Sequence, residues 1–157
     1  MDLHEWNIKN IYRGLGTREE AKKRVFAWLY NPNSEDKLTN RYYDRGLVKD
    51  RFFSKGEVKT IFNRKIEADD YHAFNYIIQS TTSDLFMKQM IKVHDFLKDK
   101  KSFIAFLIHD SLVIDFDKSE LDHINEICQI FSQTNFGDFR SSIKIGKNYG
   151  EMKEWTL

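Results

Sequence analysis

The segment TREEAKKRVFAWLYNP, residues 17–32, carries the most informative pattern in the sequence. Its Thr-x-x-Glu start is a capping-box pattern that begins a helix, and the Asn-Pro pair closes the helix, which we expect over residues 17–30. Four residues spaced by four lie on one slanting stripe of this helix: Arg18, Lys22, Phe26 and Tyr30. The stripe therefore begins with two cations and ends with two aromatic rings.

Such a stripe suits a nucleotide in both length and chemistry. Each step of four residues rises by about 6 Å, so Arg18 and Tyr30 lie about 18 Å apart along the helix. Arg18 is in the first turn, where free backbone N–H groups and the helix dipole favour an anion, and Lys22 adds charge. The rings of Phe26 and Tyr30 offer flat apolar surface for a sugar and a base. The alternative is a surface helix whose cations extend into water while Phe26, Leu29 and Tyr30 pack inward.

The composition is that of a folded protein without a membrane span. A chain of 157 residues with 41% hydrophobic content can bury one core or two small lobes. Apolar runs such as FIAFLI are too short to cross a bilayer and no secretory leader is recognisable, so we expect a cytoplasmic protein. Cys128, the one cysteine, allows no disulfide or cysteine-based zinc site, and we expect it to be a buried, inert thiol.

Charge is distributed unevenly along the sequence. Residues 1–65 hold 15 Lys and Arg against 9 Asp and Glu (15 − 9 = +6), whereas residues 66–157 hold 10 against 15 (10 − 15 = −5). The first part could hold phosphates, although acidic surfaces like the second are ordinary in soluble proteins.

The remaining hydrophobic periodicity predicts an α+β fold. A short helix is expected from Ser34, its N-cap, to a stop at Gly46, followed by an extended strand or hairpin in GEVKTIFNRKI. The later expected elements are a long helix over 70–97, a β-hairpin over 103–116, a helix over 119–134 capped at Ser119, and a terminal strand over 142–146.

The segment YHAFNYIIQSTTS, residues 71–83, has no formal charge in a chain that is 31% charged. Asn75 and Gln79 are four residues apart, and Thr82 or Ser83 continues their line. Because the minor groove of a duplex displays similar acceptors at every base pair, uncharged donors can bind DNA there without reading its sequence. The alternative is a helix face that packs against a neighbouring element.

The segment FLIHDSLVI places two polar residues between apolar runs. Phe103–Ile108 predicts a strand covered on both faces, and residues 112–116 predict its partner, with His109 and Asp110 between them. Asp is common in turns, but a carboxylate close to a buried surface needs a cation, and Mg²⁺ is one candidate.

Taken together with Asp2-Leu3-His4, these segments resemble the C-terminal fingers and palm portion of family A DNA polymerases, of the phage type. That family, which includes bacterial DNA polymerase I, carries Arg, Lys, Phe and Tyr at steps of four on a fingers helix. It also has an Asn-x3-Gln helix, a His-Asp-Glu hairpin and an Asp-Ile-His segment. The final NYGEMKEW is similar to the Gly- and Trp-containing tail of these enzymes.

The resemblance implies a role for each matching residue. Arg18, Lys22 and His4 would hold the triphosphate of the incoming dNTP, Phe26 would lie near its sugar, and Tyr30 near the templating base. Asn75 and Gln79 would contact the minor groove of the primer–template DNA, and His109 would contact the primer terminus. Asp110 would hold Mg²⁺ in a two-metal site, and Asp110 and Lys22 are the residues implied in catalysis.

The sequence also departs from the family pattern. Ser111 replaces the glutamate of the hairpin, Asn31 a glycine and Tyr71 a basic residue. In the family, the second metal-binding aspartate precedes the fingers helix. This sequence has no counterpart of that aspartate and none of the thumb. We therefore expect a fragment or split subunit, with fingers over 1–66 and distal palm over 67–157, that is inactive without a second polypeptide or a missing N-terminal part.

Two alternatives remain at this point. One is a non-catalytic DNA- or nucleotide-binding relic of the same fold, which would have no need of an acid at Asp110. The other is a structural domain whose matches are chance. The enzyme interpretation requires Arg18 and Lys22 to face the same cavity as Asp110.

Overall fold

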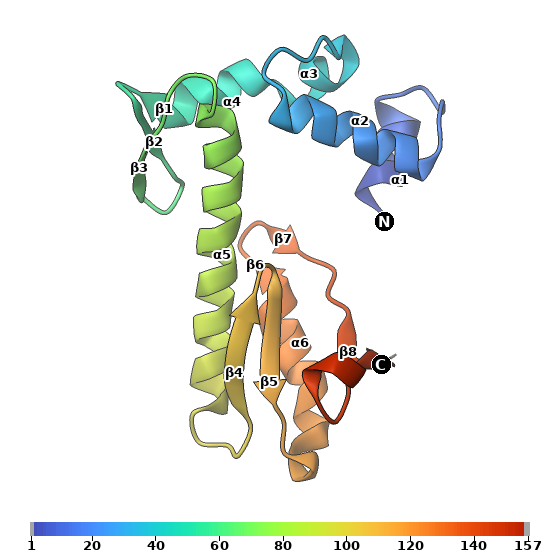
Figure 1. The fold of residues 1–157 in the computed structure, drawn as a ribbon, viewed down its shortest axis with the longest axis vertical. Coiled ribbons are helices and arrows are strands. Elements are labelled where there is room, and N and C mark those ends of the chain that lie inside the picture. The colour runs from blue at the N-terminus through green and yellow to red at the C-terminus, as the bar shows by residue number, and fades with distance from the viewer. Residues whose placement is uncertain (1, 156–157) are drawn as a thin grey trace. The chain divides into compact units, whose positions relative to one another are not determined.

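The structure, a computed structural model, describes residues 2–155. Helices and small antiparallel sheets are both present, as the α+β prediction requires (Figure 1). The chain divides into two compact units, Met1–Thr82 and Ser83–Leu157. The long helix α5 (Ala73–Leu97) begins in the first unit and continues into the second. No helix within residues 2–155 is long and apolar enough to cross a membrane.

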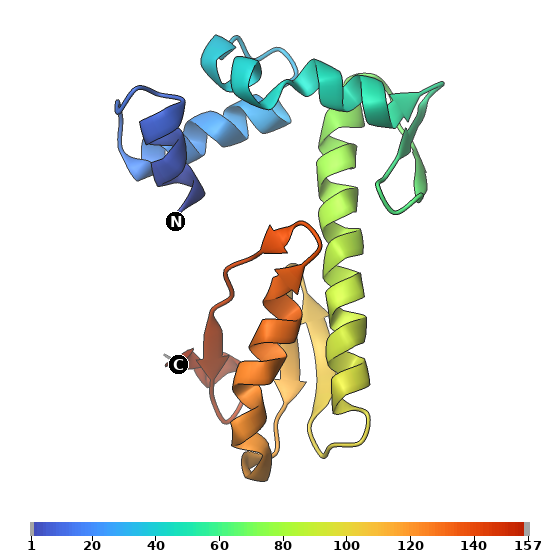
Figure 2. The same cartoon turned by 180° about the vertical axis from the view of Figure 1, so that it is seen from behind.

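Four helices form most of the first unit: α1 (Leu3–Asn10), α2 (Arg18–Tyr30), α3 (Lys37–Tyr43) and α4 (Arg45–Phe52). The predicted helix is confirmed as α2, and its capping box between Thr17 and Glu20 is complete. Ile11, Tyr12, Ala21 and Val25 form the buried core between α1 and α2. Figure 2 shows the same two helices lying against each other from behind.

A small sheet completes the first unit. Its antiparallel strands β1 (Phe53–Ser54), β2 (Glu57–Lys59) and β3 (Lys65–Glu67) lie in that order, so the predicted hairpin is confirmed. Val58 on β2 is fully buried and packs against Ala73 and Ile77 of α5. This contact joins the sheet to the start of the long helix.

The second unit packs the β4–β5 hairpin and α6 against the later turns of α5. Val93, Leu97 and Ile127 form its buried core, with Ile104 and Leu112 of the hairpin packed against them. The elements in order are β4 (Phe103–Ile108), β5 (Ser111–Asp115), η1 (Lys118–His123), α6 (Ile124–Ser132), β6 (Gln133–Thr134), β7 (Gly137–Asp138), β8 (Ile143–Ile145), η2 (Tyr149–Glu151) and β9 (Lys153–Trp155).

The predicted boundaries of the short helix after α2 are wrong. Asp36 rather than Ser34 caps α3, because its carboxylate accepts from the backbone N–H of Thr39 and is also held by Arg24. The helix stops at Asp44, whose φ of +43° is left-handed, and the same carboxylate then caps α4. Gly46 therefore lies inside α4 rather than beyond a helix end.

Two predictions near the C-terminus also need correction. The helix expected from Ser119 is capped at Asp117, whose carboxylate accepts from both the backbone N–H and the hydroxyl of Ser119. This helix begins as the 3₁₀ helix η1 (Lys118–His123), whose backbone is non-helical at Glu120. The Glu120 carboxylate accepts hydrogen bonds from the backbone N–H groups of Lys101 and Ser102. The strand near 142–146 is confirmed as β8, but it pairs with β9 and does not end the regular structure.

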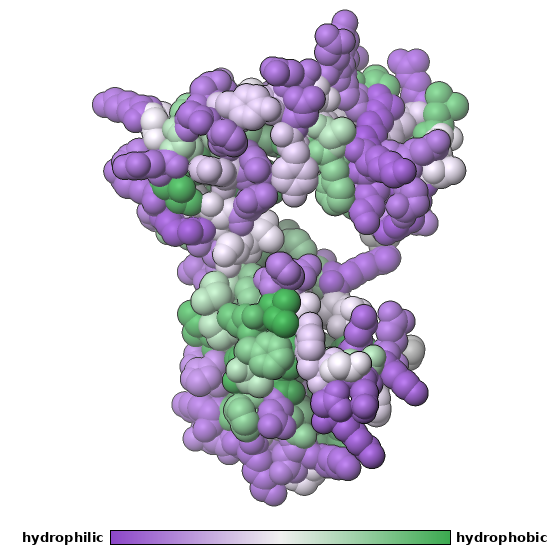
Figure 3. Space-filling model, viewed as in Figure 1, coloured by the Kyte–Doolittle hydropathy of each residue, from purple (hydrophilic) through white to green (hydrophobic). Residues whose placement is uncertain are grey.

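The predicted hairpin is confirmed, but β4 is not covered on both faces. Phe103, Phe106 and Leu107 are 56%, 42% and 37% exposed. The hairpin packs against α5 and α6 through Ile104 and Leu112, and on β4 the ring of Phe106 is only partly covered, by the ring of Tyr149 at 5.5 Å. Figure 3 shows the resulting apolar patch over the hairpin. An apolar run predicts double cover only where two layers are available.

Candidate nucleotide and nucleic-acid site

The core contacts of α2 turn its slanting stripe away from the core. Ala21, Val25 and Trp28 are buried on one side of the helix, whereas Phe26 is 41% and Tyr30 52% exposed. Two neighbouring exposed rings form a small apolar surface of the kind that ligands contact. The alternative in which Phe26 and Tyr30 pack inward is therefore wrong.

The stripe residues contact one another and one residue of α1. The ring of Phe26 lies 6.1 Å from that of Tyr30 and 6.0 Å from that of His4, with the His4 ring nearly perpendicular to it. The ammonium of Lys22 lies 5.9 Å from the centre of the Phe26 ring. We call His4, Lys22, Phe26 and Tyr30 the stripe cluster. Lys22 forms no ion pair with any residue from 2 to 155, so its charge is free for a ligand.

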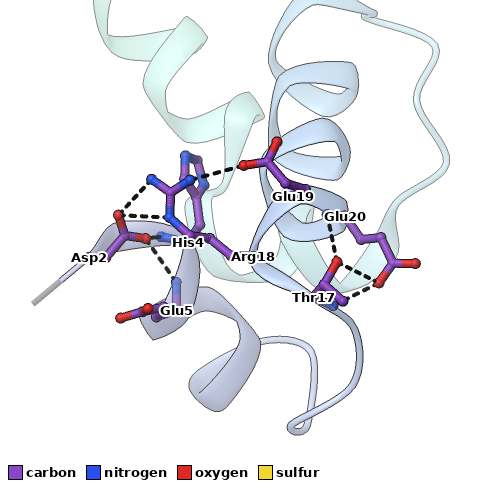
Figure 4. Close-up of polar contacts among 7 residues, drawn as sticks. All are labelled: Asp2, His4, Glu5, Thr17, Arg18, Glu19 and Glu20. Carbon is purple, nitrogen blue, oxygen red and sulfur yellow. Dashed lines mark hydrogen bonds and ion pairs between the residues drawn. The ribbon is translucent and has the colours of Figure 1, made fainter.

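Arg18, by contrast, is held by two carboxylates (Figure 4). Its Nη2 and Nε donate to Oδ2 of Asp2 at 2.9 and 3.3 Å, and its Nη1 donates to Glu19 at 3.1 Å. The other oxygen of Asp2 accepts from the backbone N–H groups of His4 and Glu5 and so caps α1. The hydrogen bond from Arg18, followed by that from Glu5, lowers the pKa of Asp2 to about 2.

The first unit also brings the end of the stripe close to the uncharged segment of α5. Tyr30 and Asn75 both line a small cavity, together with Arg45 and His72. The Oδ1 atom of Asn75 is buried there and has no hydrogen-bond partner in the described chain. Gln79, one turn further along α5, is exposed. The cavity therefore combines an aromatic ring with polar groups that still need partners.

Sequence reasoning gave no role to two residues of the first unit, Arg45 and Asp2, although Asp2 is part of the Asp2-Leu3-His4 match. The guanidinium of Arg45 lies 4.7 Å from the Trp28 ring and 5.3 Å from the Phe74 ring, and its burial lowers its pKa. No local pattern marks Arg45, because its ring partners are distant in sequence. Asp2 could have been found, since an Asp followed by Glu5 is a helix-start pattern.

In the second unit, His109 and Asp110 form the two-residue turn of the hairpin, between the paired residues Ile108 and Ser111. His109 has a φ of +51°, a left-handed conformation that costs a non-glycine residue free energy. Asp110 is exposed, so the expectation that its carboxylate lies close to a buried surface is wrong. The turn presents an acid and an imidazole to solvent.

Within residues 2–155, no group of three or more His, Cys, Asp or Glu side chains forms a complete metal site. Asp110 alone is nevertheless compatible with Mg²⁺, which commonly takes one or two carboxylates and completes its shell with water and substrate phosphates. Cys128 is half-buried and burial raises the pKa of its thiol, in agreement with an unreactive cysteine.

Comparison with known proteins links these features to one family. The sequence model of DNA polymerase family A matches residues 20–155. Over 149 residues the chain is 27% identical to DNA polymerase I of Borreliella burgdorferi. That match covers 87% of this chain and 16% of the relative. It is 32% identical over 99 residues to DNA polymerase I of Aquifex aeolicus, covering 59% of this chain and 17% of that protein.

A phage protein is similar as well. The chain is 25% identical over 114 residues to the DNA polymerase of Bacillus phage SP01, covering 64% of this chain and 12% of that protein. The chain thus spans less than a fifth of the length of each of these three relatives. His4 and Arg18 precede the range that the family model matches.

Proposed function

The chain belongs to DNA polymerase family A, and from that membership we propose that it supplies the fingers and distal palm of a template-directed DNA polymerase. The reaction is nucleotidyl transfer from a dNTP to the 3′ end of a primer. One observation of the structure supports this most directly. Phe26 and Tyr30 of the stripe cluster are exposed on α2, beside Lys22, which has no ion-pair partner among residues 2–155, and this combination of rings and cation suits a nucleotide.

In this proposal the stripe cluster and Arg18 bind the incoming dNTP. Lys22, Arg18 and His4 contact the triphosphate, where Lys22 also stabilises the charge that develops on the phosphates during transfer. Phe26 lies against the sugar and Tyr30 near the templating base. The order of cations and rings along α2 supports this orientation, because it runs from the end that favours anions towards apolar surface.

The proposed contacts with primer–template DNA come from both units. Asn75 and Gln79 on α5 offer amide groups to the minor groove, where similar acceptors are found at every base pair. His109 contacts the primer terminus from the hairpin turn. Gln79 and His109 are exposed and so available for such contacts, whereas the Oδ1 atom of Asn75 is buried without a hydrogen-bond partner among residues 2–155.

Asp110 is the residue of this chain that would hold Mg²⁺ beside the primer terminus. When bound, the ions activate the primer hydroxyl and stabilise the phosphoryl charge. The tight hairpin turn fixes the position of Asp110 relative to His109, so the carboxylate is presented without a flexible loop.

A single carboxylate does not clamp two ions from both sides. We therefore propose that the second metal-binding aspartate and the thumb come from a second polypeptide or from a missing N-terminal part, in a bacterial or phage-infected cytoplasm.

Primer extension tests this proposal. The chain is assayed with Mg²⁺, dNTPs and a primer–template, alone and mixed with the N-terminal portion of the Borreliella burgdorferi relative. We expect no extension by the isolated chain, extension by the mixture, and loss of that activity with Asp110→Asn. Extension by the pure isolated chain would contradict the split arrangement, and dNTP binding without extension by the mixture would favour a non-catalytic relic.

A matched pair of variants tests the stripe. Lys22→Ala should weaken dNTP binding by about 1.5 to 3 kcal/mol, the contribution of a charge-assisted contact. Lys23→Ala removes the same charge from the next, exposed position of α2, off the stripe, and should leave affinity unchanged. Equal effects of the two variants would show that only overall charge matters.

A further inference from the structure

Asp2 connects two of the proposed triphosphate ligands. Its Oδ1 atom accepts from the backbone N–H of His4 at 2.9 Å, and its Oδ2 atom accepts from Nη2 and Nε of Arg18 at 2.9 and 3.3 Å. One carboxylate thus ties the start of α1, which carries His4, to the start of α2, which carries Arg18 (Figure 4). The Asp2 side chain is 22% exposed and that of Arg18 47%.

The contact leaves part of the guanidinium available. An arginine has five N–H donors. Asp2 takes those on the Nε–Nη2 edge and Glu19 takes one from Nη1, which leaves one N–H on Nη1 and one on Nη2. These two N–H groups remain for phosphate oxygens while both carboxylates stay in place. Asp2 therefore restricts the orientation of Arg18 without blocking it.

We propose that Asp2 is a positioning residue of the nucleotide site, which orients Arg18 and sets its distance from His4 so that both meet the same triphosphate. This inference rests on the proposed function. The flexible arginine side chain otherwise loses conformational freedom on binding, and an orienting carboxylate removes that cost in advance. The low pKa of Asp2 means that the carboxylate is ionised whenever a nucleotide is bound near neutral pH.

The negative charge of Asp2 and its positioning role predict opposite effects on nucleotide affinity when Asp2 is replaced, so affinity measurements can separate them. A carboxylate beside a binding site repels phosphates, so its removal should tighten nucleotide binding if Asp2 has no positioning role. If Asp2 positions Arg18, its removal should weaken binding. Asp2→Asn suits the test because asparagine caps a helix as well as aspartate does and leaves α1 intact.

The control removes the same charge from a similar place. Asp44 caps α4 through the N–H of Leu47 and pairs with no arginine in the part of the chain that the structure describes. Affinity for dATP and for inorganic tripolyphosphate is measured by calorimetry on the full chain without added metal. We expect Asp2→Asn to weaken both by about tenfold, the lower end of the loss seen when a residue that orients a metal ligand is removed, and Asp44→Asn to change neither.

A double-variant cycle distinguishes positioning from a structural role. In an Arg18→Ala background, Asp2→Asn should no longer weaken binding, because there is no guanidinium left to orient. A weakening of the same size in that background, or tighter binding by Asp2→Asn alone, overturns the inference. Asp2→Ser, which also caps α1, gives the same reading if Asp2→Asn does not fold.

A failure of the proposed nucleotide-binding function can be distinguished from a failure of the positioning role of Asp2. Absence of dATP binding by the unaltered chain, or binding that Arg18→Ala and Lys22→Ala leave unchanged, argues against the nucleotide site itself and removes the basis of the inference. Binding that depends on Arg18 but not on Asp2 overturns the positioning role alone.

Discussion

Asp36→Asn should destabilise the first unit in a way that depends on pH. The Asp36 carboxylate accepts from Nη2 of Arg24 at 2.7 Å, and from the backbone N–H and hydroxyl of Thr39 at 3.1 and 2.6 Å. It therefore joins α2, which carries the stripe cluster, to α3. Asparagine retains the helix cap but loses the charge. The variant isolates the ionic part of this contact.

The magnitude follows from the pKa of Asp36. Burial alone would raise that pKa, but hydrogen bonds from Arg24 and Thr39 outweigh burial and lower it from 3.8 to about 2. A lowering of the pKa from 3.8 to about 2 corresponds to roughly 2 to 3 kcal/mol. The Asp36 side chain is only 10% exposed, but that of Arg24 is 41% exposed, so solvent screening reduces the contribution. We expect about 1 to 2 kcal/mol.

The sign of the pH dependence is set by the direction of the shift. Because the folded-state pKa lies below the unfolded value, the unfolded chain binds more protons between pH 4 and pH 2. The stabilisation is therefore present above about pH 4 and is lost as the pH falls towards 2. Asp2 titrates in the same range, but it is present in both proteins and cancels in the difference.

Urea unfolding at pH 6, 4 and 3 measures this difference. Tryptophan fluorescence follows it, and two of the three tryptophans, Trp6 and the buried Trp28, belong to the first unit. The free energy of unfolding of the unaltered chain should exceed that of Asp36→Asn by about 1 to 2 kcal/mol at pH 6, and the gap should narrow below pH 4. Asp44→Asn, a cap without an arginine partner in the described chain, is the control. A gap that does not change with pH would refute the ionic explanation.

Two further substitutions test the second unit. His109→Gly should raise the free energy of unfolding of this unit by up to about 1 kcal/mol, since glycine adopts the left-handed turn without strain. The same variant should reduce primer extension by the complemented enzyme. A lower free energy of unfolding in urea would contradict the strain at His109. Gln89→Leu should lower stability by about 2 to 3 kcal/mol, because Gln89 donates to the carbonyls of Ile130 and Gln133 at 2.7 Å, which then lose their donor. Gln129→Leu on exposed α6 surface is its control, and similar melting temperatures for the two variants would show that those carbonyls find other partners.

The elements that sequence patterns predicted correctly are those whose information is local. Helix α2 has its complete capping box between Thr17 and Glu20, three residues apart, and the β4–β5 hairpin has its polar turn between two apolar runs. Periodicity and turn chemistry decide such elements without distant partners. The same is true of α5, which carries a long apolar pattern.

The errors arise where a distant residue chooses between local options. Ser34 and Asp36 are both acceptable N-caps, and Arg24, which precedes Asp36 by twelve residues, favours the second by pairing with it. Gly46 is a plausible helix end, but Asp44 adopts the left-handed conformation first and its carboxylate starts the next helix. For β4, the apolar run predicts that the strand packs against a hydrophobic core, but it does not predict whether one or both faces of the strand are covered.

The stripe on α2 shows the same limit at the site itself. In sequence, Arg18 and Lys22 are equivalent cations one turn apart, and spacing identifies both as candidates for a phosphate. In the structure, Arg18 is held by Asp2 and Glu19, whereas the ammonium of Lys22 lies over the Phe26 ring and forms no ion pair among the described residues. A held guanidinium contributes direction and a free ammonium contributes charge. Arg18→Lys should therefore impair the site although it conserves charge, because an ammonium lacks the planar fork through which Asp2 acts.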